Sequence, residues 1–222
     1  MIPTVRVISI GALSSHPLWN EPPATRTGHT TTTLVEADDL RMVIDPGLPG
    51  PILGARLAER APLRPRDVTH VFLTAATPEH MRGLDAFPHA TWLAFETEIA
   101  HALAAVQEAL VLAEAHPEDG GVEPAAQRLA ALQRMVPADD TLAPGVDLFP
   151  SPGVTPGCCG VLVAEPRRTI VIAGDAVATR EHVAEAKVLP HCWNRDQAQE
   201  SFAEVIQIAD AIIPGRDNIV YP

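Results

Sequence analysis

The stretch VFLTAATPEHMRG, residues 71–83, decides the fold of this 222-residue chain. It opens with a short apolar run, which is typical of a strand inside a sheet. A loop of threonine and alanine follows. The proline after this loop is favourable in the first turn of a helix. The segment therefore predicts a buried strand, a short loop and the start of a helix.

Further segments of the chain also join a strand end to a tight turn of glycine or proline. Such residues fix the backbone where a chain must turn sharply. In chain order these segments are MVIDPG (42–47), SPGVTPG (151–157), IAGDAV (172–177) and IIPGRD (212–217).

Together these motifs resemble the metallo-β-lactamase superfamily, and the resemblance spans roughly residues 5–217. In that family the strand corresponding to residues 71–74 is followed by the pattern T-H-x-H-x-D-H. Only Thr74 and His80 match this pattern here. Ala75 and Thr77 stand at the two earlier histidine positions, and Glu79 stands at the aspartate position.

The later motifs keep their glycines and prolines but lose their histidines. Val154 stands where the loop S/T-P-G-H-T-P-G carries a metal-binding histidine, and Arg216 replaces the last histidine of the family. Asp175 matches the aspartate that bridges two metal ions in relatives. Four of the five histidines that the resemblance implies are missing, so a site for two metal ions is not expected.

The resemblance implies an α/β (α+β) fold, the four-layer αββα sandwich of metallo-β-lactamase type, as one domain over residues 1–222. We expect the loops after Thr74, after Gly153, at Asp175 and at Arg216 to meet at one edge of it. The apolar patterns place strands at residues 5–10, 30–35, 40–44, 68–74, 91–95, 147–150, 160–164 and 169–174. They place helices at residues 51–60, 96–116 and 196–208.

A helical insertion is predicted at about residues 97–136. Apolar residues from Ile99 to Ala113 form one stripe of the first helix, but Val111 and Leu112 fall outside it. Leu129, Leu132 and Val136 repeat at helical spacing in a second helix. The pair either packs as a layer on the sandwich or serves as a lid or as the interface of a homodimer, because an apolar surface of this kind must be covered.

Composition excludes several classes of protein. A net charge of −12 argues against a nucleic-acid partner, which requires clustered lysine and arginine. No run approaches the roughly 20 apolar residues of a membrane span. The N-terminal segment lacks the pattern of a signal peptide, and three cysteines are too few for a disulfide framework, so a cytoplasmic protein is expected.

Two arrangements of charge compete at the altered site. Glu79, His80 and Asp175 remain as ligands for a single zinc or other divalent ion. Arg216, however, carries a permanent positive charge and has no lone pair for a metal. Arg216 could instead neutralise both carboxylates through a bidentate ion pair, in a pocket that includes Thr77 and Val154. We expect this second arrangement, and hence no metal cofactor.

Other residues are candidates for replacement ligands or for supporting roles. The candidate replacement ligands are His16, His29, His182, His191 and Cys192, although an exposed or core position is the more common role for a lone histidine. Asp45 is expected to orient loops by hydrogen bonding. The vicinal pair Cys158 and Cys159 is interpreted as two small buried residues, and Trp19, Trp92 and Trp193 as packing residues, with Trp19 also available to a ligand.

Three functional hypotheses follow. The first is a non-catalytic or weakly active member that binds a small molecule or a partner protein through the old pocket. The second is a single-metal hydrolase of an ester, lactone or thioester bond that uses Glu79, His80 and Asp175. The third is a metal-free enzyme in which Glu79 or Asp175 is the general base and His80 the acid.

Overall fold

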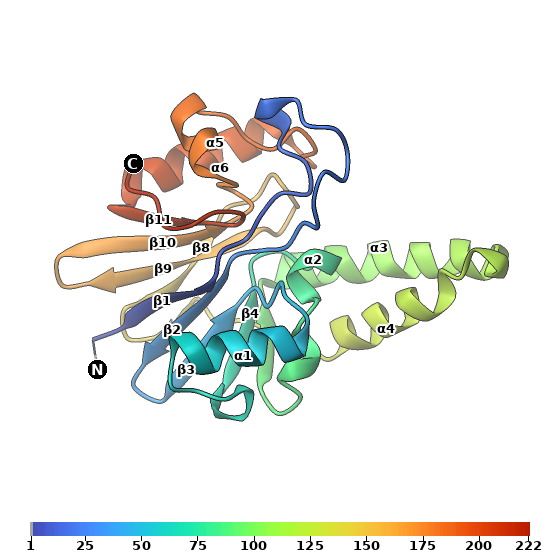
Figure 1. Ribbon diagram of the computed structural model, residues 1–222, viewed down its shortest axis with the longest axis horizontal. Coiled ribbons are helices and arrows are strands. Elements are labelled where there is room, and N and C mark those ends of the chain that lie inside the picture. The colour runs from blue at the N-terminus through green and yellow to red at the C-terminus, as the bar shows by residue number, and fades with distance from the viewer. Residues whose placement is uncertain (1) are drawn as a thin grey trace.

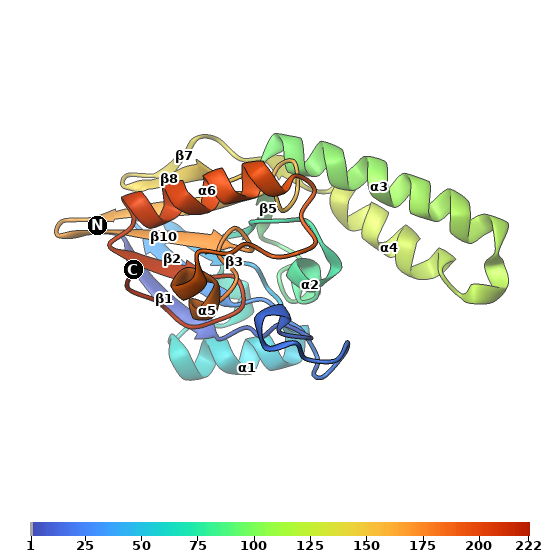
Figure 2. The same ribbon diagram turned by 90° about the horizontal axis from the view of Figure 1, so that it is seen from above.

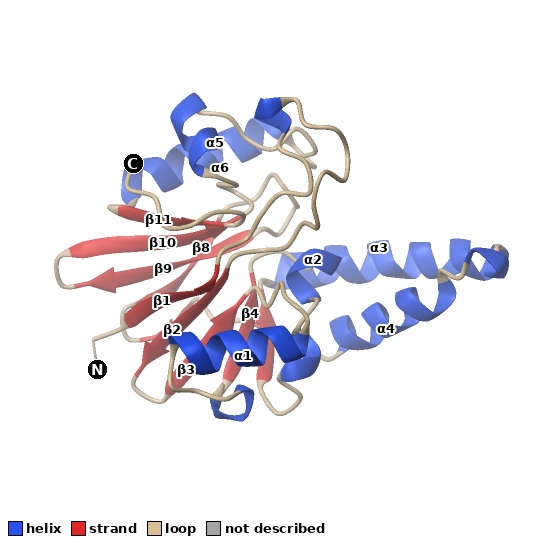
Figure 3. Cartoon of the chain, viewed as in Figure 1, coloured by secondary structure: helices blue, strands red, loops and turns tan. Residues whose placement is uncertain are grey.

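Two β-sheets face each other in the computed structural model, which describes residues 2–222, and helices cover the outer face of each sheet (Figure 1, Figure 3). The first sheet has the order β1-β2-β3-β4-β5-β6. Its strands are β1 (Thr4–Ser9), β2 (Thr32–Ala37), β3 (Leu40–Ile44), β4 (His70–Leu73), β5 (Thr91–Ala94) and β6 (Val136–Pro137). The second sheet has the order β11-β10-β9-β8-β7. Its strands are β7 (Thr141–Ala143), β8 (Val146–Pro150), β9 (Cys159–Glu165), β10 (Arg168–Gly174) and β11 (Ala211–Pro214).

Helix α1 lies against the first sheet, and α5 and α6 lie beyond the second (Figure 1, Figure 2). The helices are α1 (Gly50–Arg60), α2 (Pro78–Met81), α3 (Glu96–Ala115), α4 (Val122–Gln133), α5 (Arg180–Glu185) and α6 (Arg195–Ile208). Short 3₁₀ helices occupy Pro17–Trp19, Pro65–Asp67, Leu84–Ala86 and Pro117–Asp119. Within residues 2–222, no helix combines the length and the apolar character that a membrane span requires.

Alternation along the strands produces the layers. In β4, Val71 and Leu73 point to the core beneath α1, whereas Phe72 points to the core between the two sheets. In β10, Ile170 enters the core between the sheets and Val171 enters the core beneath α6. Successive side chains of a strand point to opposite faces, so apolar strands of this kind must be covered on both sides. The predicted αββα sandwich is confirmed.

The hairpin of α3 and α4 extends away from the sandwich (Figure 1, Figure 2). The base of α3 is anchored by Ile99 and Val106, which are buried in the core of the first sheet. Val111 and Leu112, farther along the same helix, are 66% and 62% exposed. The homodimer through this hairpin stays a prediction, and these two side chains are the apolar surface that it would cover.

Two sequence expectations, one after the hairpin and one before α6, are wrong. The second helix ends at Gln133, and Val136 belongs to β6, where it pairs with Leu93 of β5. Backbone pairing at the sheet edge thus outweighs the helical spacing of the apolar residues. Trp193 is 60% exposed and is not a packing residue, because it lies in the loop before α6.

Candidate functional site

The motif loops converge at one edge of the sandwich, as predicted. The backbone N–H of Cys159 donates to the carbonyl oxygen of Thr74 at 3.0 Å, and that of Gly215 donates to Gly174 O at 2.8 Å. A Cβ added at Gly215 would lie 2.5 Å from Oδ1 of Asp175. The glycine before Arg216 therefore permits a close approach of the terminal loop to the loop that carries Asp175.

Arg216 lies between two carboxylates at this edge. Its Nε donates to Asp175 Oδ1 at 2.8 Å and its Nη2 donates to Asp175 Oδ2 at 2.7 Å, which is a bidentate ion pair. Its Nη1 donates to Oε2 of Glu79. Arg216 is 7% exposed and Asp175 is 6% exposed, whereas the Glu79 side chain is 35% exposed. This is the ion pair that the sequence predicts for Arg216.

The Arg216 cation sets the charge of Asp175. Burial alone would raise the pKa of this carboxyl group, but the adjacent guanidinium more than offsets burial and lowers the pKa to about 2. Burial likewise disfavours the charged form of Arg216, and the two carboxylates overcome this effect and raise its pKa above the usual value. Both partners are therefore charged at neutral pH.

His80 is fully buried beside this ion pair. Its Nδ1 shares a hydrogen bond of 2.7 Å with Oγ1 of Thr77, and its Nε2 is buried without a hydrogen-bond partner. That Nε2 lies 3.7 Å from Asp175 Oδ2. Burial lowers the pKa of His80 to about 4, although Asp175 opposes the change. The imidazole is therefore neutral at pH 7.

Asp45 holds the loop of the altered motif in place, as expected. Its Oδ1 accepts the backbone N–H of Thr74 at 2.8 Å, and its Oδ2 accepts the Thr74 hydroxyl at 2.6 Å. Burial raises the pKa of Asp45 to about 7, although the bonds from Thr74 oppose this change. Both carboxylate oxygens bond to Thr74 in the loop, one to its backbone and one to its hydroxyl, so Asp45 is a positioning residue.

Glu98 supports the same loop from the first turn of α3, a role that the sequence analysis missed. Its carboxylate is buried and accepts the N–H of Ala76 at 2.7 Å and the hydroxyl of Thr155 at 2.6 Å. On the other side, Arg128 of α4 donates to the carbonyl oxygen of Ala76 at 2.9 Å. The hairpin thus holds two motif loops, and no sequence motif identified this contact.

A second polar cluster lies next to Arg216. The Thr179 hydroxyl donates to Oε2 of Glu181 at 2.7 Å. The hydroxyl oxygen of Thr179 also lies 2.9 Å from Nδ1 of His182 and 3.2 Å from Nε2 of His16. With its hydrogen directed to Glu181, the hydroxyl must accept from both imidazoles. His182 Nε2 and His16 Nδ1 are buried without hydrogen-bond partners. Burial lowers the pKa of His182 to about 4.

Of these two histidines, His16 borders a cavity of about 290 Å³ that Thr179 and Arg216 also line. Trp19 lies at its edge, stacks on the ring of His16 at 4.0 Å between centroids, and is 55% exposed. The other candidate ligands lie elsewhere. His29 Nε2 lies 3.1 Å from the carbonyl oxygen of Ile10, His191 is exposed, and Cys192 donates its thiol to Leu189 O.

The donor set does not fit a metal ion. Among residues 2–222, no three histidine, cysteine or acidic side chains are arranged to hold a metal. Ala75 and Val154 offer no side-chain donor atom, and the guanidinium of Arg216 occupies both oxygens of Asp175. A divalent cation at this point would stand against a permanent positive charge.

The sequence and the fold have identifiable relatives. Residues 25–215 match the family model described as the metallo-beta-lactamase superfamily. A putative metallo-beta-lactamase from Thermotoga maritima is 16% identical over 100% of both chains, with a TM-score of 0.73. A probable metal-dependent hydrolase from Staphylococcus aureus is 15% identical over 98% of this chain and 90% of its own, with a TM-score of 0.73.

A lactonase is also similar in fold. AidC, a dizinc quorum-quenching lactonase solved with its product, is 19% identical over 80% of this chain and 67% of its own, with a TM-score of 0.64. At these identities the structural likeness establishes the fold alone. Comparison with curated proteins finds no match.

Proposed function

The chain belongs to the metallo-β-lactamase superfamily, and we propose that it is a non-catalytic or weakly active homologue of the family's hydrolases, which binds a small molecule through the old metal pocket. The observation that carries this proposal is the ion pair of Arg216 with Asp175 and Glu79. In this proposal the guanidinium supplies the positive charge that relatives draw from metal ions.

The charge of Arg216 cannot supply the chemistry of a metal. A metal ion lowers the pKa of a bound water and polarises a carbonyl oxygen. A guanidinium donates hydrogen bonds but holds no water as a ligand. Three of its five N–H groups are directed at Asp175 and Glu79, so two carboxylates already compensate the charge that would stabilise the oxyanion of a reacting ester or lactone.

None of the three candidate catalytic residues is free for proton transfer. Glu79 and Asp175 each accept from Arg216, and a carboxylate with a pKa of about 2 is a poor base at neutral pH. His80 is neutral, but it is 0% exposed, so a substrate in the cavity cannot reach its ring. These contacts favour binding over the metal-free acid–base mechanism.

The cavity of about 290 Å³ beside Arg216 is the proposed binding site. The exposed indole of Trp19 offers an aromatic surface, and the cluster of His16 and Thr179 lines the same cavity. A site with one aromatic wall and a few fixed polar groups suits a small molecule that has both a flat face and hydrogen-bonding atoms.

The test is an activity panel of ester, lactone and thioester substrates, chosen because AidC is described as a lactonase and lies in the same fold. We expect turnover close to the buffer rate, with no change after Asp175→Asn or after dialysis against a chelator. Turnover that is lost in Asp175→Asn and after chelation would instead establish the single-metal hydrolase that uses Glu79, His80 and Asp175.

A further inference from the structure

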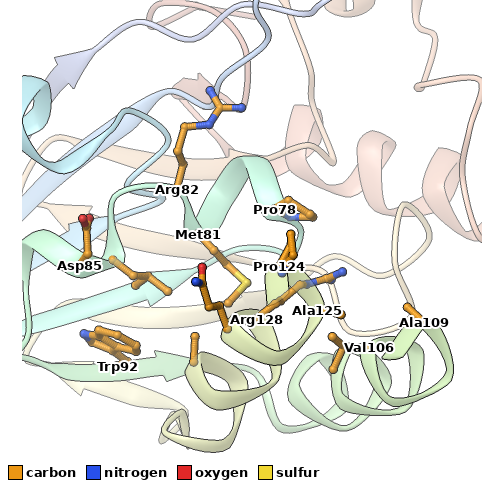
Figure 4. Close-up of a pocket in the computed structure, with 13 residues that line it drawn as sticks. Pro78, Met81, Arg82, Asp85, Trp92, Val106, Ala109, Pro124, Ala125 and Arg128 are labelled. Carbon is orange, nitrogen blue, oxygen red and sulfur yellow. The ribbon is translucent and has the colours of Figure 1, made fainter. Parts of the chain in front are cut away.

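A cavity of about 610 Å³ lies outside the Arg216 site, between α2 and the α3–α4 hairpin (Figure 4). Its wall is mainly apolar and includes Met81, Leu84, Trp92, Val106 and Ala131. Pockets that bind small molecules are commonly about 300–1,000 Å³ and are apolar with few polar groups. The size and lining of this cavity therefore fit an organic ligand.

Two arginines line this cavity, and they differ in direction. The Arg82 side chain leads away from the other lining residues, whereas Arg128 lies among them (Figure 4). Arg82 donates from Nη1 to the carbonyl oxygen of Gly28 at 3.0 Å. Arg128 is therefore the cation that a ligand in the cavity would meet.

The charge of Arg128 has no direct carboxylate partner within residues 2–222. Its Nη2 donates to the backbone carbonyl oxygen of Ala76, and its Nε is buried without a partner. The charge of Glu98 is near enough to raise the pKa of Arg128, but its oxygens bond to Ala76 and Thr155 and not to the guanidinium. Burial is the larger effect and lowers the pKa of Arg128. A half-buried cation beside an apolar wall is stabilised by an anion.

Other polar groups of the cavity do not supply that anion. Asp85 is exposed and lies across the set of lining residues from Arg128 (Figure 4). The amide of Gln127 donates to Glu123 at 2.6 Å. The cavity thus combines an apolar interior with one cation that, among the described residues, makes no direct ion pair.

We propose that this cavity binds an amphipathic carboxylate, with the apolar body between α2 and the hairpin and the carboxylate against the Arg128 guanidinium. The ligand and Ala76 O would both accept hydrogen bonds from Arg128. Ala76 lies just before α2, and α2 contains Glu79 and His80 of the Arg216 site. The proposed ligand therefore touches the same short helix as the ion pair, but from its other side.

Isothermal titration calorimetry with decanoate tests the proposal, and decanol serves as the uncharged probe of similar length. Both are used below the concentration at which they aggregate. We expect one decanoate to bind per chain, at least about tenfold more tightly than decanol, because a hydrogen bond to a charged group contributes about one such factor or more. Equal affinity for the two probes, or no binding of decanoate, would overturn the proposal.

Two variants locate the site. Arg128→Gln removes the charge and keeps an amide that can reach Ala76 O, so it should weaken decanoate about tenfold or more and leave decanol unchanged. Ala131→Phe places a ring on the wall of the cavity and should weaken both probes. Arg66→Gln is the matched control, because Arg66 has a side chain 70% exposed and does not line the cavity.

The contrary results are equally specific. Decanoate affinity that is the same in Arg128→Gln and in Arg66→Gln would show that the charge of Arg128 does not contribute to binding. Affinity that is unchanged in Ala131→Phe would place the probe elsewhere on the surface. If Arg128→Gln does not fold, as judged by circular dichroism, the preference of the parent protein for decanoate over decanol still tests the charge. None of these measurements depends on metal binding or hydrolysis.

Discussion

Replacing Arg216 with alanine should destabilise the protein strongly, because the substitution leaves Asp175 charged and buried without its partner. The two side chains are 6% and 7% exposed, and the pair is bidentate. Removing one partner of a buried ion pair costs about 3–5 kcal/mol. For a chain of this size, 1 kcal/mol corresponds to about 2–4 °C in melting temperature. The expected fall is therefore about 6–20 °C, and the part due to half-exposed Glu79 is the smaller one.

A neighbouring surface pair provides the control. Arg180 also forms a bidentate pair, with Asp217, but the Arg180 side chain is 58% exposed. Exposed pairs contribute about 0–1 kcal/mol, so Arg180→Ala should lower the melting temperature only slightly. Differential scanning calorimetry of both variants at pH 7 makes the comparison. If the melting temperature of Arg216→Ala is close to that of Arg180→Ala rather than well below it, the electrostatic role assigned to Arg216 is wrong.

A second substitution separates charge from packing. Asp175→Asn removes the negative charge that Arg216→Ala leaves uncompensated. The double variant should therefore be more stable than the sum of the two single effects predicts, by about 1 kcal/mol or more. Strict additivity in denaturant unfolding would contradict the direct coupling of these two side chains.

Three further predictions concern groups around the site. Glu98→Ala removes a buried carboxylate that accepts two hydrogen bonds, and should lower the free energy of unfolding by about 3 kcal/mol in urea titrations; a loss below 1 kcal/mol would contradict this support role. The pKa of His80 is about 4, below its ordinary 6.5, so the stability it contributes is present above pH 6.5 and is lost as the pH falls toward 4. The difference in melting temperature between the parent and His80→Asn should accordingly shrink from pH 7 to pH 4, and a constant difference would refute this. Cys158 and Cys159 are buried whereas Cys192 is partly exposed, so a thiol reagent should label Cys192 first in the native protein and all three after unfolding.

The sequence was sufficient for the layers of the fold and for the geometry of Arg216. Strands β4 and β10 are continuous apolar runs, which predicts cover on both faces, and their successive side chains do enter different cores. The motif loops kept the glycines and prolines that bring Asp175 and Arg216 together, so loss of the histidines did not hide the site. Motif order thus specified contacts that are 41 residues apart in sequence.

Contacts that no motif encodes could not be predicted in this way. His16 and Thr179 are 163 residues apart, and each stands in a loop with no ligand spacing around it. Glu98 resembles any acidic residue in the first turn of a helix, and only the packing of α3 shows that it holds Ala76. Val136 fits the helical spacing of Leu129 and Leu132, but it pairs with Leu93 at the edge of the first sheet. The sequence spacing does not show where that sheet ends.

The central claim is that Arg216 takes the place of the metal, and metal content tests this claim most directly. Protein purified without added metal, and a second sample incubated with zinc and then desalted, are analysed by inductively coupled plasma mass spectrometry beside Arg216→His. We predict well under one equivalent of zinc, iron or manganese in both parent samples, and a gain of zinc in Arg216→His, which restores a nitrogen donor. One equivalent of metal in the parent protein, lost in Asp175→Asn, would contradict the account.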